Sequence, residues 1–70
     1  MQDQLNWDDS YAIARSLMAA HPGQDLEAVS LSQIHSWTLQ LSDFHDDPQL
    51  SNEAILLAIF RDWFEEVNIK

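Results

Sequence analysis

The sequence of 70 residues contains no cysteine, one glycine and two prolines, and it has no long hydrophobic run. Without cysteine the chain cannot form a disulfide framework, a thiolate zinc site, a redox CxxC pair or the thiolate ligation of a metal cluster. Its longest apolar run, residues 54–60, is far too short to span a bilayer. Residues 1–5 lack the basic start and the apolar stretch of a signal peptide. These absences predict a soluble, cytoplasmic protein with no membrane partner.

Basic residues are also scarce, with three Lys and Arg against twelve Asp and Glu, which leaves a formal net charge of −9. Nucleic-acid binding depends largely on Lys and Arg side chains that contact phosphates, so this charge argues against a nucleic-acid partner. Three cations can pair with only a few of the twelve carboxylates. Most of the acids must therefore face water, a metal ion or a cationic partner.

The length predicts a single domain over residues 1–70, with a flexible N-terminus over residues 1–5. For a chain of this mass, surface scaling predicts a folded accessible area of about 4,500 Å². So thin a core offers little room for a deep catalytic cleft, and no Ser-His-Asp context, phosphate loop or nucleotide fingerprint occurs. We therefore expect a monomer that is not an enzyme.

Apolar spacing predicts a first helix over about residues 9–21, with Asp8 as its N-cap. The run His21-Pro22-Gly23 is a typical helix stop. In residues 29–31 apolar and polar side chains alternate, which predicts a short extended segment. A second helix is predicted over residues 33–41, with Ser32 as its N-cap.

Residues 42–50 read as a loop, and the strongest helical pattern follows it. Ser51 or Asn52 is expected to cap this third helix. Its predicted buried stripe consists of Ile55, Leu56, Ile59, Phe60, Trp63 and Val67, and the side chains that widen the apolar face are Leu57, Ala58 and Phe64. The predicted fold is all-α, a small three-helix domain in the order of a winged-helix core but without length for the wing.

Acidic residues cluster at two places that suit helix N-termini. Asp8 and Asp9 precede the first helix, where carboxylates interact favourably with the helix dipole. Asp43, Asp46 and Asp47 flank a proline turn before the third helix. This second cluster is either a solvated turn with an Asx-type hydrogen bond or a weak, oxygen-only site for a hard divalent ion.

A third acidic pair, Glu65 and Glu66, lies near the end of the third helix, where the dipole disfavours anions. Arg61 and Lys70 are at the spacing for partial pairing, but such exposed pairs contribute little. The pair is either functional or part of a helix end that frays into solvent.

The three histidines do not have the i, i+4 spacing of helical zinc ligands. His21 is expected to cap the first helix, and His35 reads as a satisfied helix residue. His45 lies beside Asp46 and Asp47, and it is the one histidine that merits a test for metal binding.

Several motifs together resemble the IscX family, also called YfhJ. They are Trp7-Asp8-Asp9-Ser10, His35-x-Trp37, Asp43-Phe44-His45-Asp46-Asp47-Pro48 followed by Ser51-Asn52-Glu53, and Trp63 with Glu65-Glu66. The resemblance implies a small acidic accessory protein of bacterial iron–sulfur cluster assembly, with a modified winged-helix fold. It further implies binding to the cysteine desulfurase IscS on a surface shared with frataxin and ferredoxin, and weak binding of ferrous iron.

Two positions depart from the pattern of that family. His45 stands where another acid is usual, which replaces a hard carboxylate with a ring nitrogen and puts iron binding at this loop in doubt. Asp8 stands where threonine is common, which adds charge before the first helix.

The unpaired acids and the resemblance together predict an adaptor that presents a carboxylate-rich face to a basic surface of the desulfurase. The residues expected to contact the partner are Asp8, Asp9, His35, Asp43, Asp46, Asp47, Glu65 and Glu66. Weak Fe²⁺ binding is expected at Asp43, Asp46 and Asp47, with no tightly bound cofactor. The alternative from the same charge is an acidic DNA mimic that blocks a DNA-binding protein. A winged-helix DNA binder is rejected because residues 33–41 contain no Lys or Arg.

Overall fold

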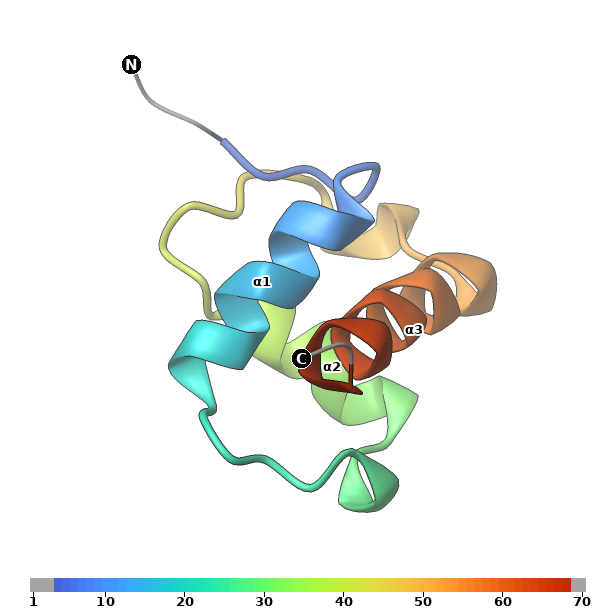
Figure 1. Ribbon diagram of the computed structural model, residues 1–70. Helices are drawn as coiled ribbons and strands as arrows, with labels where there is room; N and C mark the ends of the chain where they lie inside the picture. The colour runs from blue at the N-terminus through green and yellow to red at the C-terminus, as the bar shows by residue number, and fades with distance from the viewer. Residues whose placement is uncertain (1–3, 69–70) are drawn as a thin grey trace.

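The computed structural model describes residues 4–68 as five helical elements (Figure 1). They are α1 (Ser10–Ala20), the short 3₁₀ turn η1 (Leu26–Ala28), α2 (Leu31–Leu39), the 3₁₀ turn η2 (Pro48–Leu50) and α3 (Glu53–Asn68). Over these residues the prediction of an all-α domain with three helices is confirmed. The accessible area is 4561 Å², close to the value expected from the mass.

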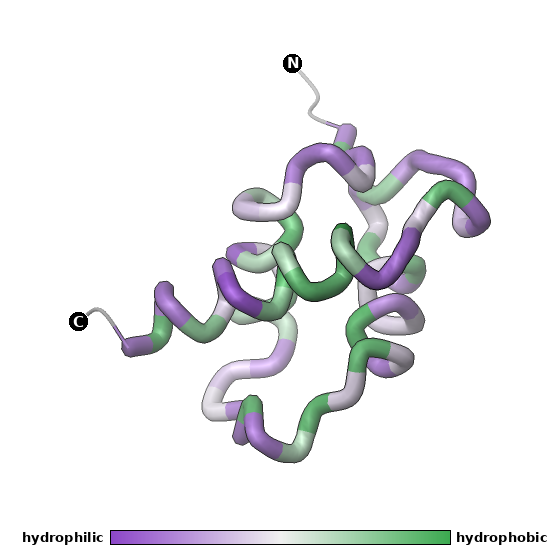
Figure 2. The backbone as a smooth tube through the Cα atoms, turned by 90° about the vertical axis from the view of Figure 1, so that its right-hand side faces the viewer, coloured by the Kyte–Doolittle hydropathy of each residue, from purple (hydrophilic) through white to green (hydrophobic). Residues whose placement is uncertain are grey.

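The long helix α3 is the spine of the core. It packs most extensively against α1 and to a lesser degree against α2, while α1 and α2 touch each other little (Figure 1). The tube in Figure 2 alternates between hydrophobic and hydrophilic segments along the helices, as amphipathic helices require. The most deeply buried apolar side chains come from all three helices and include Ile13, Leu17, Ile34, Ile59 and Trp63. None of the helices within residues 4–68 is long and apolar enough to cross a membrane.

The start of α2 differs from the prediction, because Ser30 and not Ser32 is its N-cap. The Ser30 side chain accepts a hydrogen bond from the backbone N–H of Gln33 at 3.1 Å, and the Gln33 side chain accepts one from the backbone N–H of Ser30 at 2.9 Å. This reciprocal capping box satisfies two backbone donors at once, which Ser32 has no matching residue to do. The helix therefore begins at Leu31 and ends at Leu39.

The N-cap position of α1 is Asp9 and not Asp8, and its side chain makes no capping hydrogen bond within the helix. Instead the Asp9 carboxylate accepts from the backbone N–H of Asn6 at 3.0 Å. The helix start is held from elsewhere, since the Ser10 hydroxyl donates to the Asp62 carboxylate of α3 at 2.7 Å. At α3 the expected cap is present, with Asn52 Oδ1 accepting from the backbone N–H of Ile55 at 2.9 Å.

The connection between α1 and α2 is only partly extended. Helix α1 stops at Ala20, as the His21-Pro22-Gly23 run predicts, and Gly23 takes a φ of 76° that a side chain would disfavour. The turn η1 follows, and only Val29 and Ser30 of the predicted segment have extended backbone. Within residues 4–68 there is one isolated parallel bridge, between Leu5 and Phe44, and no strand.

The N-terminal segment lies beside the loop before α3 (Figure 1). The backbone N–H of Leu5 donates to the Asp43 carbonyl at 2.8 Å, and the Leu5 carbonyl accepts from the N–H of His45 at 3.0 Å. The Leu5 side chain is buried in the core cluster. Residues 1–3 of the predicted flexible N-terminus lie outside the described residues.

The apolar face of α3 is narrower than the sequence predicts. Leu57, Phe64 and Val67 are 48%, 47% and 41% exposed, although the first two were expected to widen the buried face and Val67 to belong to its stripe. The buried residues of α3 are Ile59 and Trp63, because α1 and α2 cover one side of this helix.

Candidate functional site

Trp7 joins the N-terminal segment (residues 4–9) to the acidic loop (residues 42–50) that precedes α3. Its side chain is only 2% exposed, and its ring meets Phe44 edge to face with the centroids 4.6 Å apart. Its backbone N–H donates to Asp46 Oδ2 at 3.1 Å, and its indole N–H donates to the Asp47 carbonyl at 2.8 Å. A buried indole needs a partner for its N–H, and the acidic loop provides that partner.

Asp46 and Asp47 are the acids that shape the loop. Asp46 Oδ1 accepts from the backbone N–H of Asp47 at 2.7 Å, while its other oxygen accepts from Trp7. Asp47 Oδ1 accepts from the backbone N–H of Gln49 at 2.9 Å and caps η2, which is the Asx-type hydrogen bond of one of the two interpretations that the sequence left open for this turn. Three of the four oxygens on these two side chains therefore already accept backbone N–H groups.

His35 braces the same loop from α2. Its ring stacks on Trp7 with the centroids 5.5 Å apart and the planes 13° apart, and Nε2 lies 3.1 Å from the Pro48 carbonyl. Two residues later on the helix, Trp37 stacks on His21 at 4.1 Å and meets Trp63 at 6.2 Å. The two aromatic residues of the His35-x-Trp37 motif thus hold different neighbours. His35 orders the loop, and Trp37 joins α2 to the end of α1 and to α3.

The predicted contact residues fall into two groups. Six of them lie where the N-terminal segment, the acidic loop and α2 meet, namely Asp8, Asp9, His35, Asp43, Asp46 and Asp47. We call this surface the acidic junction. The side chains of Asp8, Asp43 and Asp47 are exposed there. Glu65 and Glu66 lie near the C-terminal end of α3, about 20 Å along the helix from its N-cap. The structure therefore does not bring the eight residues into one cluster.

Glu66 is paired with a residue that the sequence did not suggest. Its carboxylate lies 3.9 Å from Arg15 on α1, and this is the one ion pair among residues 4–68. A hydrogen bond from Arg15 to the Tyr11 hydroxyl at 3.3 Å raises the pKa of the guanidinium, and the charge of Glu66 raises it further. Glu65 is exposed, and Lys70 lies outside the described residues.

Metal ligands are not gathered in advance. Over residues 4–68 no group of three or more His, Asp or Glu side chains is placed to hold a metal ion. The His45 side chain is exposed, and the oxygens of Asp46 and Asp47 are largely occupied by backbone donors. The loop therefore has the donor type that hard cations prefer but no convergent ligand set.

Sequence reasoning named Trp7 and Pro48 only as parts of motifs and missed that they organise this site. Trp7 and Pro48 bind Asp46, Asp47 and His35 through contacts that join residues about 40 positions apart or cross between elements. No local pattern encodes these pairings. The capping box at Ser30 was visible in the sequence as Ser-x-x-Gln.

Comparison with known proteins relates the chain to a described family and to curated relatives. A family model described as iron–sulphur cluster assembly matches residues 5–68. An uncharacterized protein of Pseudomonas aeruginosa is 39% identical over 62 residues, which is 89% of this chain and 94% of the relative. The family match includes the N-terminal segment, the acidic loop and all three helices.

Proposed function

We propose that this chain, which belongs to the iron–sulphur cluster assembly family (IscX/YfhJ), is an adaptor that docks its acidic junction onto a basic surface of a cysteine desulfurase, IscS. Family membership assigns the chain a role in iron–sulfur cluster assembly. The desulfurase as partner, the iron chemistry and the contact residues are the proposal. An acidic DNA mimic would use the same negative charge, so charge alone does not separate the two functions. Membership of a cluster-assembly family favours the adaptor.

The observation that carries the proposal is the order of the acidic loop. Asp46 and Asp47 are tied to Trp7 and His35 braces the turn, so the exposed carboxylates of Asp43 and Asp47 are held on ordered backbone. Asp8 adds a third exposed carboxylate on the segment next to Trp7. A preordered acidic surface loses little conformational entropy on binding, and its field speeds the approach of a cationic partner.

Ferrous iron would bind this surface weakly and as cargo. Three carboxylate oxygens of Asp46 and Asp47 already accept backbone N–H groups, which leaves Asp43 and the free oxygen of Asp47 as the available hard donors. Neutralising those charges with Fe²⁺ would weaken docking to a basic surface. Docking is therefore expected to respond to iron, and frataxin and ferredoxin are expected to compete for the same desulfurase surface.

Calorimetric titration of a cysteine desulfurase at about 0.05 M and about 0.5 M salt tests the proposal, because screening weakens exposed charge contacts. We expect binding at low salt that weakens at least about tenfold at high salt. The double variant Asp8→Asn, Asp43→Asn removes two exposed charges without removing a capping side chain, and it should weaken binding by about tenfold.

The matched control is Glu27→Gln, which removes an exposed charge on η1, away from the acidic junction. Its affinity for the desulfurase should stay within about twofold of the wild type. Absence of binding at low salt would refute the proposal. Displacement of duplex DNA from a basic DNA-binding protein, without desulfurase binding, would favour the DNA mimic instead.

A further inference from the structure

The outward face of α3 carries an exposed apolar strip. Leu57, Phe64 and Val67 make up half of the six large hydrophobic side chains that are exposed among residues 4–68. Phe60 is half-buried and stacks on Phe64, with ring centroids 6.3 Å apart and planes 20° apart. These four residues recur at spacings of three and four, which places them on one side of the helix. We refer to Leu57, Phe60, Phe64 and Val67 as the apolar strip.

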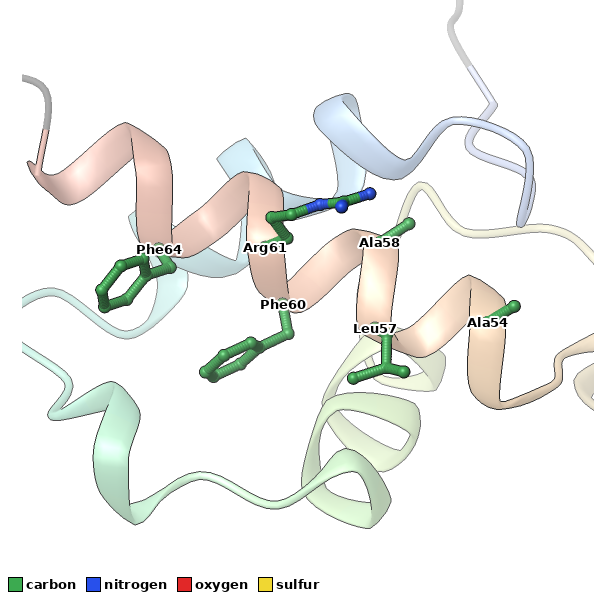
Figure 3. Close-up of a pocket in the computed structure, with 6 residues that line it drawn as sticks. All are labelled: Ala54, Leu57, Ala58, Phe60, Arg61 and Phe64. Carbon is green, nitrogen blue, oxygen red and sulfur yellow. The ribbon is translucent and has the colours of Figure 1, made fainter.

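Two hollows adjoin the strip. The larger, of about 520 Å³, is an open groove lined by Ala54, Leu57, Ala58, Phe60, Arg61 and Phe64 (Figure 3). In Figure 3, Leu57, Phe60 and Phe64 point to the same side of α3, while Arg61 and Ala58 point to the other. Phe64 also lines the second hollow, of about 190 Å³, at the end of the helix. The surface from Ala54 to Asn68 is about 20 Å long, which is the length of a helix of about four turns.

The charges beside the strip are mostly negative. Asp25 and Glu27 line the second hollow together with Phe64 and Val67. Glu53 begins the helix, and Glu65 follows Phe64 directly. Arg61 is the one cation that lines either hollow. An occupant with an apolar side and flanking Lys or Arg would match both the strip and its borders.

A second copy of the chain fits this surface poorly. Each copy has a formal charge of −9, and pairing two α3 helices would bring the same acidic borders together. That repulsion opposes self-association, although the strip itself is apolar. The occupant therefore has to supply the positive charge.

We propose that the apolar strip of α3 is a docking site for a cationic amphipathic helix of a partner protein. The apolar side of that helix covers Leu57, Phe60 and Phe64, and its Lys or Arg side chains meet Asp25 and Glu27 at the far end. This surface is separate from the acidic junction, and its argument rests on the geometry of α3 and not on desulfurase binding.

The test uses the full chain, ¹⁵N- and ¹³C-labelled, and a synthetic leucine–lysine peptide of about 18 residues, or five helical turns, with leucines on one helical face. The comparison peptide has the same composition and charge but spreads its leucines around the helix. We expect the amphipathic peptide to bind at least about tenfold more tightly. The methyl signals of Leu57 and the ring signals of Phe64 should shift first.

Variants separate the strip from general charge attraction. Leu57→Ser with Phe64→Ser should remove the preference for the amphipathic peptide, whereas Leu39→Ser with Leu50→Ser, at exposed positions outside α3, should preserve it. Glu27→Gln should weaken the amphipathic peptide by about threefold. Circular dichroism checks that each variant is folded, and the wild-type shift map tests the site independently of any variant.

Three results would overturn the proposal. The first is equal affinity for the two peptides, and the second is shifts confined to the acidic loop. The third is a dimer, seen by analytical ultracentrifugation, that the Leu57→Ser, Phe64→Ser variant dissociates, because a second copy would then occupy the strip. Peptide binding without desulfurase binding would leave this proposal standing and refute only the proposed function.

Discussion

The acidic junction around Trp7 and the apolar strip of α3 both contain aromatic and acidic side chains, but they differ in how far those side chains are buried and hydrogen-bonded. At the junction an aromatic ring is buried and the carboxylates beside it accept backbone hydrogen bonds. At the strip an aromatic ring, Phe64, is half-exposed, and Glu65 next to it is exposed as well. The difference shows that the role of an acidic or aromatic residue depends on its neighbours in space and cannot be assigned from its residue type alone.

The largest expected effect is the contrast between Trp7→Ala and Phe64→Ala. Trp7→Ala removes a buried ring together with its hydrogen bond to the loop, and we expect a loss of about 3–5 kcal/mol in the free energy of unfolding. Phe64→Ala removes a half-exposed ring and should cost less than about 1.5 kcal/mol. Urea unfolding followed by far-UV circular dichroism measures both values. Equal losses would mean that the two regions do not differ in packing.

A smaller effect separates two aspartates of the same loop. Asp46→Ala leaves the backbone N–H groups of Trp7 and Asp47 without their acceptor, and it should cost about 1–3 kcal/mol. Asp43→Ala removes an exposed side chain and should change stability by less than about 0.5 kcal/mol. Urea unfolding gives the stabilities, and hydrogen exchange at the Trp7 and Asp47 amides reports the loop. Unchanged exchange in Asp46→Ala would contradict the role given to its carboxylate.

The smallest effect is expected at the far end of α3. Glu66→Gln removes the ion pair with Arg15, whose side chains are 29% and 54% exposed. Water and salt screen such a pair. The unfolding midpoint of the Glu66→Gln variant in urea should therefore match that of the wild type at about 0.15 M salt. A clear loss of stability that disappears at about 1 M salt would show that this end of the helix is held electrostatically. In that case the pair of Glu66 with Arg15 would be a second contact, besides those of the acidic junction, that stabilises the fold.

Much of the fold could be predicted because helices have local signals. The stop at His21-Pro22-Gly23, the cap at Asn52 and the apolar periodicity of α3 all depend on residues within a few positions of one another. The error at Ser32 was also local, since Ser30 with Gln33 forms the stronger cap. Both serines precede the same apolar pattern, and the reciprocal bond of the capping box decides between them.

The candidate site could be predicted only by residue type. Asp43 and Asp46 lie three positions apart in the same loop, and nothing near them in sequence distinguishes them. Asp46 orders the loop because Trp7, 39 residues away, directs a backbone N–H at it. Leu57 and Phe64 belong to the apolar pattern of α3, but periodicity does not say how wide a face α1 and α2 cover.

By itself the sequence determined an acidic, cysteine-free, three-helix domain with the motifs of its family, because composition, periodicity and caps are local properties. Only the tertiary structure decided which carboxylates accept hydrogen bonds and which are exposed. It also decided which apolar residues of α3 remain uncovered. Those outcomes depend on contacts between elements far apart in the chain, because hydrogen bonds and burial require closeness in space and not closeness in sequence. The two proposed docking surfaces are what that packing leaves free.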